Sequence, residues 1–343
     1  MSFNGHIRID MANCGEERIL MKRLFVLIVT CGLALGGLTP ATQAKEQLVI
    51  GYLSGGEASP FVNQVTKSLR AEAKKLKVKL VECDSNFLSD KALECAKTLS
   101  AAKPKAIINW QFDPTVSAKV CEGYKNLPTV TLDTPNEPCA KVFVGADNYA
   151  AGLLAGDALG KWTKTKLNCV YDVFLAVELP TLADINKKRA GGTREGFEKV
   201  CGKVPDAKYK MIDKTQGGSD ALENIRRQTT DILTANPGAK AILASSPYSD
   251  ADGIALTKAV DTAGRGSNLK AVINHGAEAV GHDYIRNDAR WIGSVGYFPE
   301  RYGAIALPAA IKLATGQKVA KELLMKHQVV TKKNINKIYP KEK

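Results

Sequence analysis

Short apolar runs that alternate with segments of helical period constrain the fold of this chain more than any other feature. The run Ala106-Ile107-Ile108 is typical, because it is apolar at consecutive positions rather than at alternate ones. A strand of this kind is buried on both faces, as the strands of parallel sheets are. The repeated order of strand, helix and strand predicts βαβ units, whose right-handed crossovers give parallel sheets covered by helices.

The alternation predicts strands at 48–53 and 78–83 and helices at 61–76 and 90–102. Further strands are expected at 106–109, 129–132, 141–144, 168–176, 209–212, 241–244, 270–273 and 291–295. These strands are too many for one doubly wound sheet, and a chain of 343 residues is too long for one compact core. We therefore predict an α/β fold with two doubly wound, Rossmann-like domains.

The residues before the first strand have the pattern of a secretory signal peptide. A basic start at Met21-Lys22-Arg23 precedes an apolar run over 24–38, and Thr42-Gln43-Ala44 forms a small-residue cleavage site. The apolar run is too short, and wrongly flanked, for a membrane span. We expect a signal peptide over 21–44 that is cleaved near Ala44, an upstream extension over 1–20, and export to the periplasm. Met21 is the expected start, with Met1 and Met11 as the alternatives.

Six cysteines follow this leader, and an even number in an exported chain predicts disulfides. They are Cys83, Cys95, Cys121, Cys139, Cys169 and Cys201. Six cysteines allow about 15 pairings, and their order favours three local ones, 83 with 95, 121 with 139 and 169 with 201. A metal site is the alternative, but the chain has no CxxC and its histidines are not spaced as ligands. Cys31 follows Thr30 inside the apolar run, which is a poor setting for lipid attachment.

Charge and motifs exclude several classes of function. The net charge is +13, but the basic residues are spread along the chain beside acids, and no recognition motif accompanies them. A solvated basic surface is therefore expected, with no nucleic-acid partner. Nucleophile elbows, P-loops, HExxH and GxGxxG are absent as contiguous patterns. We assign no catalytic residue, metal or cofactor, and a hydrolase built from dispersed Ser, His and Asp residues is a distant alternative.

The loops that follow the expected strands hold the candidate ligand-binding residues, because ligands of doubly wound sheets bind at the carboxyl ends of the strands. These loops mix aromatic faces with carboxylates, amides and hydroxyls. They contain Ser59, Phe61, residues 109–113, Asp133, residues 147–148 and 245–250, His275 and Tyr297. A sugar requires this mixture, because its ring carbons stack on aromatic faces while each buried hydroxyl needs a hydrogen-bond partner.

With these residues in place, the chain after the leader resembles the ribose- and galactose-type family of periplasmic binding proteins. The segments that carry the resemblance are Ser59-Pro60-Phe61, residues 126–133, Val144-Gly145-Ala146-Asp147-Asn148, Arg194-Glu195-Gly196-Phe197, residues 232–237, Thr262-Ala263-Gly264 and Thr315-Gly316. The resemblance implies a clamshell of two lobes that closes on a ligand. It also implies a monomer that delivers its ligand to an ABC permease in the inner membrane.

The resemblance further implies the lobes, the hinge and the contacts. One lobe is expected over 46–146 and 298–326 and the other over 147–297 and 327–343, with crossings near Ala146, Tyr297 and His327. The family's binding positions match Ser59, Phe61, Asn109, Asp133, Ser249, Asp250, His275 and Tyr297, with Arg189 or Arg194 as the basic contact. At Val62, Thr134, His275 and residues 217–219 the chain departs from the residues usual at these positions in the family, which argues against ribose as the ligand. Trp110 is expected to supply the main stacking surface.

The expected function is an exported receptor for a monosaccharide or a related polyhydroxy ligand. A non-sugar ligand (a nucleoside, polyol or sugar acid) and a role as the input of a chemoreceptor or sensor kinase stay open. Structural roles compete at single positions, with Trp110 in the core, Phe61 stapling a helix, Asp133 capping a turn and Asp147 capping a helix. A regulator related to the lac repressor is disfavoured, because a signal peptide stands where its DNA-binding headpiece would be.

Overall fold

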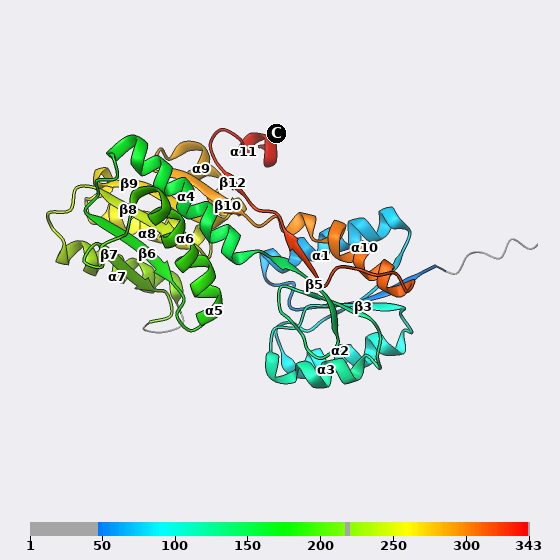
Figure 1. Cartoon of the computed structure of the whole chain (residues 1–343). Helices are drawn as coiled ribbons and strands as arrows, with labels where there is room; N and C mark the ends of the chain where they lie inside the picture. The colour runs from blue at the N-terminus through cyan, green and yellow to red at the C-terminus, as the bar shows by residue number, and fades with distance from the viewer. Residues whose placement is uncertain (1–46, 217–219, 342–343) are drawn as a thin grey trace, which may run out of the picture. The chain divides into compact units, whose positions relative to one another are not determined.

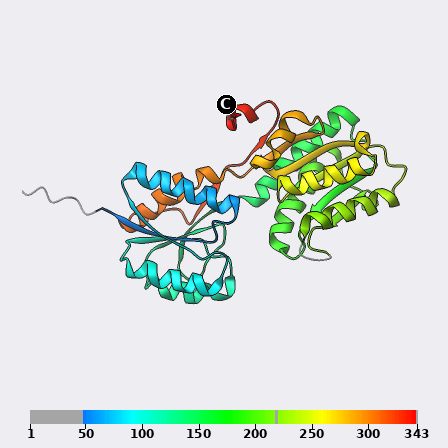
Figure 2. The same cartoon turned by 180° about the vertical axis from the view of Figure 1, so that it is seen from behind.

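The computed structural model describes residues 47–216 and 220–341, which form two parallel sheets covered by helices (Figures 1 and 2). The predicted fold class is thereby confirmed. The expected signal peptide, the upstream extension and residues 217–219 lie outside the described residues. Within the described part of the chain, no helix is both long and apolar enough to cross a bilayer.

The first sheet is parallel throughout. Its strands, in spatial order, are β11 (Glu322–Met325), β5 (Ala140–Ala146), β4 (Thr129–Leu132), β3 (Ala106–Asn109), β1 (Val49–Ser54) and β2 (Lys79–Asp84). The helices α1 (Pro60–Leu76) and α10 (Gly303–Ala314) cover one face, and α2 (Ser89–Ala101) and α3 (Ser117–Gly123) cover the other. The central strands β3 and β4 are buried at every position, which explains their continuous apolar runs.

The second sheet repeats this plan with one antiparallel edge strand, β12. Its strands, in spatial order, are β12 (Gln328–Val330), β10 (Trp291–Gly296), β9 (Leu269–Gly276), β8 (Ile242–Ser246), β6 (Val173–Glu178) and β7 (Tyr209–Asp213). The helices α4 (Asn148–Leu167) and α6 (Gly192–Cys201) cover one face. The other face carries α7 (Ala221–Ala235), α8 (Asp250–Thr262), α9 (His282–Asn287) and α11 (Ile335–Ile338). A short helix, α5 (Ala183–Asn186), follows β6.

The chain passes between the sheets three times, after β5, after β10 and between β11 and β12. The edge strands β11 and β12 were not predicted, because each has only three or four residues and is largely exposed or half-exposed. The strand expected at 168–176 was placed too early. Asn168 and Cys169 end α4 in the left-handed conformation, and β6 begins at Val173.

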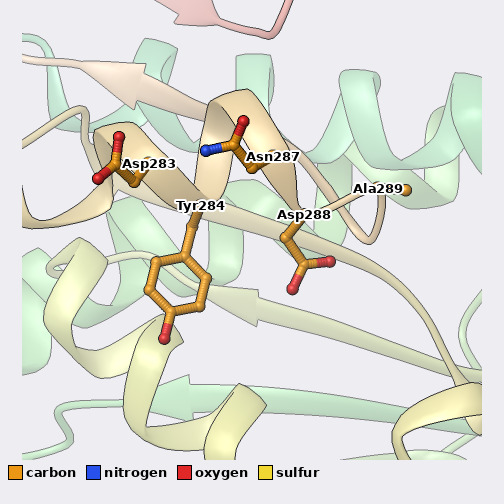
Figure 3. A pocket seen from close by; sticks show the side chains of 5 residues that line it. All are labelled: Asp283, Tyr284, Asn287, Asp288 and Ala289. Atoms are coloured by element: carbon orange, nitrogen blue, oxygen red, sulfur yellow. The ribbon is translucent and has the colours of Figure 1, made fainter.

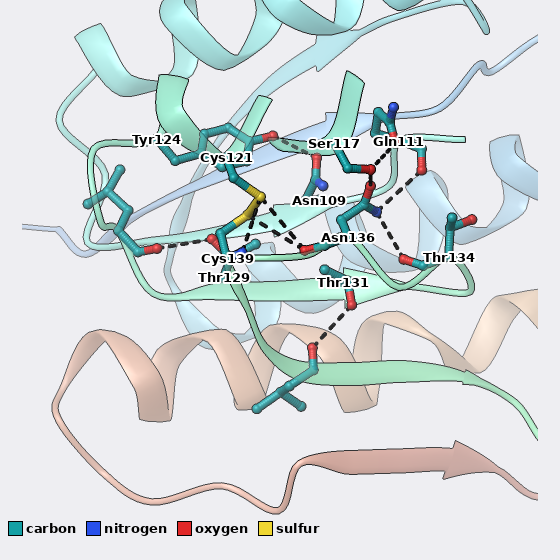
Figure 4. The surroundings of a disulfide bond; sticks show 12 residues. Asn109, Gln111, Ser117, Cys121, Tyr124, Thr129, Thr131, Thr134, Asn136 and Cys139 are labelled. Carbon is teal, nitrogen blue, oxygen red and sulfur yellow. Dashed lines mark hydrogen bonds between the residues drawn. A yellow bond between two sulfur atoms is a disulfide. The ribbon is translucent and has the colours of Figure 1, made fainter. Parts of the chain in front are cut away.

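All three disulfides predicted from the order of the cysteines are present. Cys83 of β2 bonds to Cys95 of α2, and Cys169 after α4 bonds to Cys201 of α6. The third bridge joins Cys121 of α3 to Cys139, directly before β5 (Figure 4). Each bridge links neighbouring elements around the same sheet. By closing a loop of the unfolded chain, each is expected to raise the free energy of unfolding by about 2–4 kcal/mol.

Close contact between α4 and α6 depends on glycine at the crossing. A Cβ atom on Gly156 would lie 2.1 Å from the carbonyl oxygen of Thr193 and 2.6 Å from the amide nitrogen of Phe197. Both neighbours are backbone atoms, so they cannot rotate away. Gly191, at the start of α6, offers a matched control, because a Cβ atom there meets nothing within 4 Å.

We therefore expect Gly156→Ala to lower the free energy of unfolding by about 1–3 kcal/mol, the usual cost of overpacking. Gly191→Ala should leave it unchanged or raise it by up to about 1 kcal/mol, because alanine favours helix. Urea unfolding followed by circular dichroism measures both. Equal stability of the two variants would contradict the close packing of α4 on α6.

Candidate functional site

The residues expected to bind ligand lie at the carboxyl ends of the strands, in two groups, one for each sheet. The group on the first sheet contains Ser59, Phe61, Asn109, Trp110 and Asp133. The group on the second sheet contains Arg189, Ser249, Asp250, His275 and Tyr297. Arg194 lies apart from it, within α6 and against Val204 and Asp206, which precede β7. Parallel pairing places loops that are distant in sequence at the same edge of each sheet, which is where doubly wound sheets bind ligands.

Three aromatic rings pack together on the first sheet. The ring of Phe61, at the start of α1, lies edge-on to Trp110 with centroids 6.0 Å apart and to Tyr302 with centroids 5.8 Å apart. Trp110 is 1% exposed and is covered by Tyr302 and Phe112, at 6.5 and 5.4 Å. Phe61 keeps part of its surface exposed. Trp110 therefore supports the ring of Phe61, and we transfer the proposed stacking role from Trp110 to Phe61.

Asp133 follows β4 in the left-handed conformation, with φ of 49°. Its Oδ1 accepts hydrogen bonds from the Tyr302 hydroxyl at 2.8 Å and from the Ala146 amide at 3.0 Å. Burial raises the pKa of Asp133, although these two bonds oppose the rise. Both bonds use the same oxygen, so Oδ2 is left to accept from a ligand hydroxyl. The sequence did not reveal Tyr302, because its only local signal is its place directly before Gly303.

On the second sheet, Arg189, Asn148, Tyr297 and His275 form a connected polar group. The Arg189 Nε donates to Asn148 Oδ1 at 2.7 Å, and its guanidinium carbon lies 4.6 Å from the centroid of the Tyr297 ring. The Tyr297 hydroxyl lies 3.2 Å from His275 Nδ1 and donates weakly to Asn148 at 3.5 Å. Among residues 47–216 and 220–341, Arg189 makes no ion pair, which leaves its terminal nitrogens for a ligand. The sequence places Asn148 among the candidate loop residues 147–148 but favours a role in opening α4.

Burial keeps the other members of this group uncharged. The pKa of His275 lies well below its usual value, first because the ring is buried and then because Arg189 and His327 add positive charge. Burial raises the pKa of Tyr297 to about 12, so the phenol stays protonated. The group therefore presents one positive charge, on Arg189, together with neutral hydrogen-bonding atoms. One of these is the buried Nε2 of His275, which has no partner in the described part of the chain.

Three of the predicted residues are engaged in local structure. Arg194 pairs with Glu198 and Asp206, both at 3.0 Å, and stacks over Tyr209. Ser249 caps α8 by accepting from the Asp252 amide at 3.1 Å. Asn109 accepts from the Tyr124 hydroxyl at 2.6 Å, beside the disulfide drawn in Figure 4. We leave these three side chains out of the proposed contacts.

Asp250 is wholly buried and forms a reciprocal pair of bonds with Glu278 in the loop after β9. The Glu278 amide donates to Asp250 Oδ2 at 2.6 Å, and the Asp250 amide donates to Glu278 Oε2 at 3.1 Å. Burial raises the pKa of Asp250 to about 7, and the negative charge of Glu278 adds to the shift. This pair fixes the loop that follows β9, directly after His275 and Gly276, so we assign Asp250 to positioning rather than to contact.

The predicted hinge residues lie near the three passages between the sheets. The Ala146 amide donates to Asp133, and Nδ1 of His327 donates to the Gly296 carbonyl, 3.0 Å away. The His327 ring also packs on Tyr297, with centroids 4.7 Å apart. The hinge motion and the boundaries of the two lobes stay predictions.

A surface hollow beside α9 contains none of the predicted ligand residues (Figure 3). It is lined by Asp283, Tyr284, Asn287, Asp288 and Ala289. Its two carboxylates are paired, Asp283 with Arg286 at 3.5 Å and Asp288 with Arg290 at 2.7 Å. Such a shallow site with neutralised acids offers little to a polyhydroxy ligand, and the strand-end groups are the better candidates.

Comparison with known proteins places this architecture in a family. Residues 50–318 match the model of the periplasmic binding protein domain. The chain belongs to this family. Among curated relatives of this periplasmic binding protein is the ribose import binding protein of Escherichia coli (strain K12), 24% identical over 307 residues that cover 87% of this chain and 95% of that one. The corresponding protein of Bacillus subtilis (strain 168) is 23% identical over 299 residues, covering 84% and 89%.

Solved structures share the fold of this periplasmic binding protein. A periplasmic solute binding protein of an ABC transporter from Actinobacillus succinogenes 130z, with bound D-allose, has a TM-score of 0.67 at 20% identity. That match covers 85% of this chain and 100% of the other. A solute binding protein from Mycobacterium smegmatis, with bound glycerol, has a TM-score of 0.66 at 20% identity and covers 86% and 98%.

The buried proton on Asp250 predicts a pH dependence of stability for this periplasmic binding protein. In the unfolded chain Asp250 loses its proton near pH 4, whereas the folded protein keeps it until about pH 7. The stability that this proton contributes is therefore lost as pH rises through that range. Asp250→Asn carries no titrating proton at this position, so its stability should not fall over this pH range. Relative to the wild type, its melting temperature should rise by a few degrees as the pH is raised from 5 to 8.

Asp288→Asn is the control with the opposite sign. Although burial opposes the shift, hydrogen bonds from Arg290 lower the pKa of Asp288. The stability that the charged carboxylate of Asp288 contributes is lost as pH falls. The melting temperature of Asp288→Asn should therefore differ least from that of the wild type at low pH. Calorimetric melting from pH 2 to pH 9 measures both variants, because the contribution of Asp288 is lost only below its unfolded pKa. A constant difference between wild type and Asp250→Asn would contradict the buried proton.

Proposed function

We propose that this chain is an exported receptor that captures a small polyhydroxy ligand and delivers it to an ABC importer. The observation that carries the proposal is the pair of strand-end groups. The group on the first sheet offers the ring of Phe61 and the carboxylate of Asp133. The group on the second sheet offers Arg189 and the neutral atoms of His275 and Tyr297. Aromatic faces, a carboxylate and amide or guanidinium donors are what the carbon faces and hydroxyls of a sugar require.

The names of the relatives support the same proposal. The two curated relatives are ribose import proteins, and the solved structures of the same fold hold allose and glycerol, which are polyhydroxy compounds. The three disulfides support export, because such bonds persist in oxidising compartments. We therefore propose a periplasmic location, after cleavage of the signal peptide near Ala44, and a monomer that contacts an inner-membrane permease.

The arrangement of the described histidines supports binding rather than hydrolysis. One ring nitrogen of each is bonded: Nδ1 of His275 to the Tyr297 hydroxyl, Nε2 of His282 to the Ala277 carbonyl and Nδ1 of His327 to the Gly296 carbonyl. The Nε2 atoms of His275 and His327 have no partner among the described residues, and so carry no Ser hydroxyl or Cys thiol there. Nucleophilic catalysis by Ser or Cys would place a hydroxyl or thiol at one of these nitrogens. Delivery of the bound ligand to a chemoreceptor or a sensor kinase uses the same site and is the alternative to import.

A thermal-shift screen of the purified mature protein tests this function, after removal of co-purified ligand by partial unfolding. The panel contains monosaccharides, polyols, sugar acids and nucleosides. A ligand present at about 1,000 times its dissociation constant should stabilise the protein by about 4 kcal/mol. With the responding compound, Arg189→Gln should weaken binding about 10- to 100-fold, because a hydrogen bond to a charged group contributes about 1.5–3 kcal/mol.

Arg194→Gln is the matched control for this experiment. Its side chain is held by Glu198 and Asp206, so the variant should keep the affinity of the wild type. Isothermal titration calorimetry measures both variants. Equal losses in the two variants would contradict the proposed contact by Arg189, and no response to any compound of the panel would contradict the receptor function.

A further inference from the structure

Two phenylalanine rings lie together on the surface of the first sheet's layer, beside the proposed site. Phe87 belongs to the loop after β2 and Phe112 to the loop after β3, and their ring centroids are 5.1 Å apart. Phe87 is 49% exposed, Phe112 is 40% exposed, and the adjoining Leu88 is 45% exposed. Large apolar side chains that gather at the surface mark a place where something binds.

The backbone around these rings is shaped to hold them there. A Cβ atom on Gly55 would lie 2.1 Å from the ring of Phe112, and one on Gly56 would lie 2.3 Å from the ring of Phe87. Each ring therefore rests on a glycine. Asn86 and Phe87 are both left-handed, with φ of 49° and 60°, which is costly for an aromatic residue. A strained conformation that keeps an apolar ring in water indicates a role in binding.

The hollow between the rings offers apolar faces rather than hydrogen bonds. Its lining includes Phe87, Leu88, Phe112, Ser89 and Gln111. The Ser89 hydroxyl donates to Asp113, and the Gln111 amide donates to the Asp113 carbonyl and accepts from Ser117. Since these polar groups are already bonded to the protein, the faces of the two rings are the binding surface. Such faces stack on the C–H face of a sugar ring or on a planar aromatic ring.

The two exposed rings are linked to the proposed ligand site through the buried ring of Trp110. The ring of Phe112 lies 5.4 Å from Trp110, whose ring lies 6.0 Å from Phe61. Gly55 and Gly56, on which the two exposed rings rest, belong to the same loop as Ser59. The Ser59 amide donates to the Gly56 carbonyl at 3.1 Å. A ligand ring stacked on Phe61 therefore has a second aromatic surface at the next position along the same strand edge.

Resting on the proposed receptor function, we propose that Phe87 and Phe112 form a second subsite that stacks a second ring of the ligand. The ligand class is then a glycoside with two rings, either a disaccharide or a sugar with a ring-bearing substituent. The first ring occupies the site of Phe61, Asp133 and Arg189. The second ring lies on the two phenylalanines, and its own hydroxyls face solvent.

The test compares one-ring and two-ring probes on the same protein. Glucose, galactose and ribose are titrated beside their phenyl glycosides and beside the disaccharides cellobiose and lactose, by isothermal titration calorimetry. The wild type should bind the matching two-ring probe about 2- to 10-fold more tightly than its parent sugar, since a stacked pair of rings contributes about 0.5–1.5 kcal/mol. The double variant Phe87→Ala, Phe112→Ala should lose this gain. Phe87→Ala alone, which leaves Phe112 against Trp110, should reduce the gain and keep the affinity for the parent sugar.

Met211→Ala is the matched control, because Met211 is also 49% exposed but lies on β7 of the second sheet. The Met211→Ala variant should bind the one-ring and the two-ring probes as tightly as the wild type does. If two-ring probes bind no better than their parent sugars, or if the double variant weakens both kinds of probe equally, the second subsite is wrong while the receptor function stands. If no probe of either kind binds the wild type, the receptor function itself fails. A second variant, Gly56→Ala, should displace the ring of Phe87 and reduce the two-ring gain alone.

Discussion

Parallel pairing of the strands is the constraint on which the rest of this structure depends. Because β1, β3 and β4 run in the same direction, residues 54, 109 and 132 end at one edge, and the loops that follow them are brought together. The same holds for β6, β8, β9 and β10 in the second sheet. The buried strands supply stability, and their ends supply side chains that are distant in sequence. Neither strand-end group could form without the sheet behind it.

The chemistry of the two groups is set by burial. A buried imidazole at His275 and a buried phenol at Tyr297 stay neutral, so Arg189 is the charged member of its group. Asp133 supplies a carboxylate on the first sheet, oriented by Tyr302. Behind the ligand edge of the second sheet, Asp250 and Glu278 bind each other's backbone and fix the loop of His275. In the proposed site, binding and positioning are therefore assigned to different carboxylates.

Fold and site were predictable from the sequence to different degrees, for physical reasons. Continuous apolar runs such as 106–109 identify buried strands, and an even set of cysteines in chain order identified the three bridges. The edge strands β11 and β12 were missed because they are short and half exposed. For the site, prediction from sequence was limited because a sequence does not say which neighbours cover or pair with a residue. Trp110 is buried by other rings, and Arg194 is held by two carboxylates. Tyr302 was missed, and for Asn148 a role in opening α4 was preferred to a place in the site, since each acts through a partner far along the chain.

The central claim is that one ligand is held by both strand-end groups. Small-angle X-ray scattering of the mature protein, with and without a saturating ligand from the thermal screen, tests it most directly. The account predicts that the radius of gyration falls on binding, because Arg189 on one sheet and Asp133 on the other are drawn to the same molecule. In Asp133→Asn, saturation should need more ligand, with the same final radius. Tight binding with an unchanged radius of gyration would contradict the claim and would assign the ligand to one sheet alone.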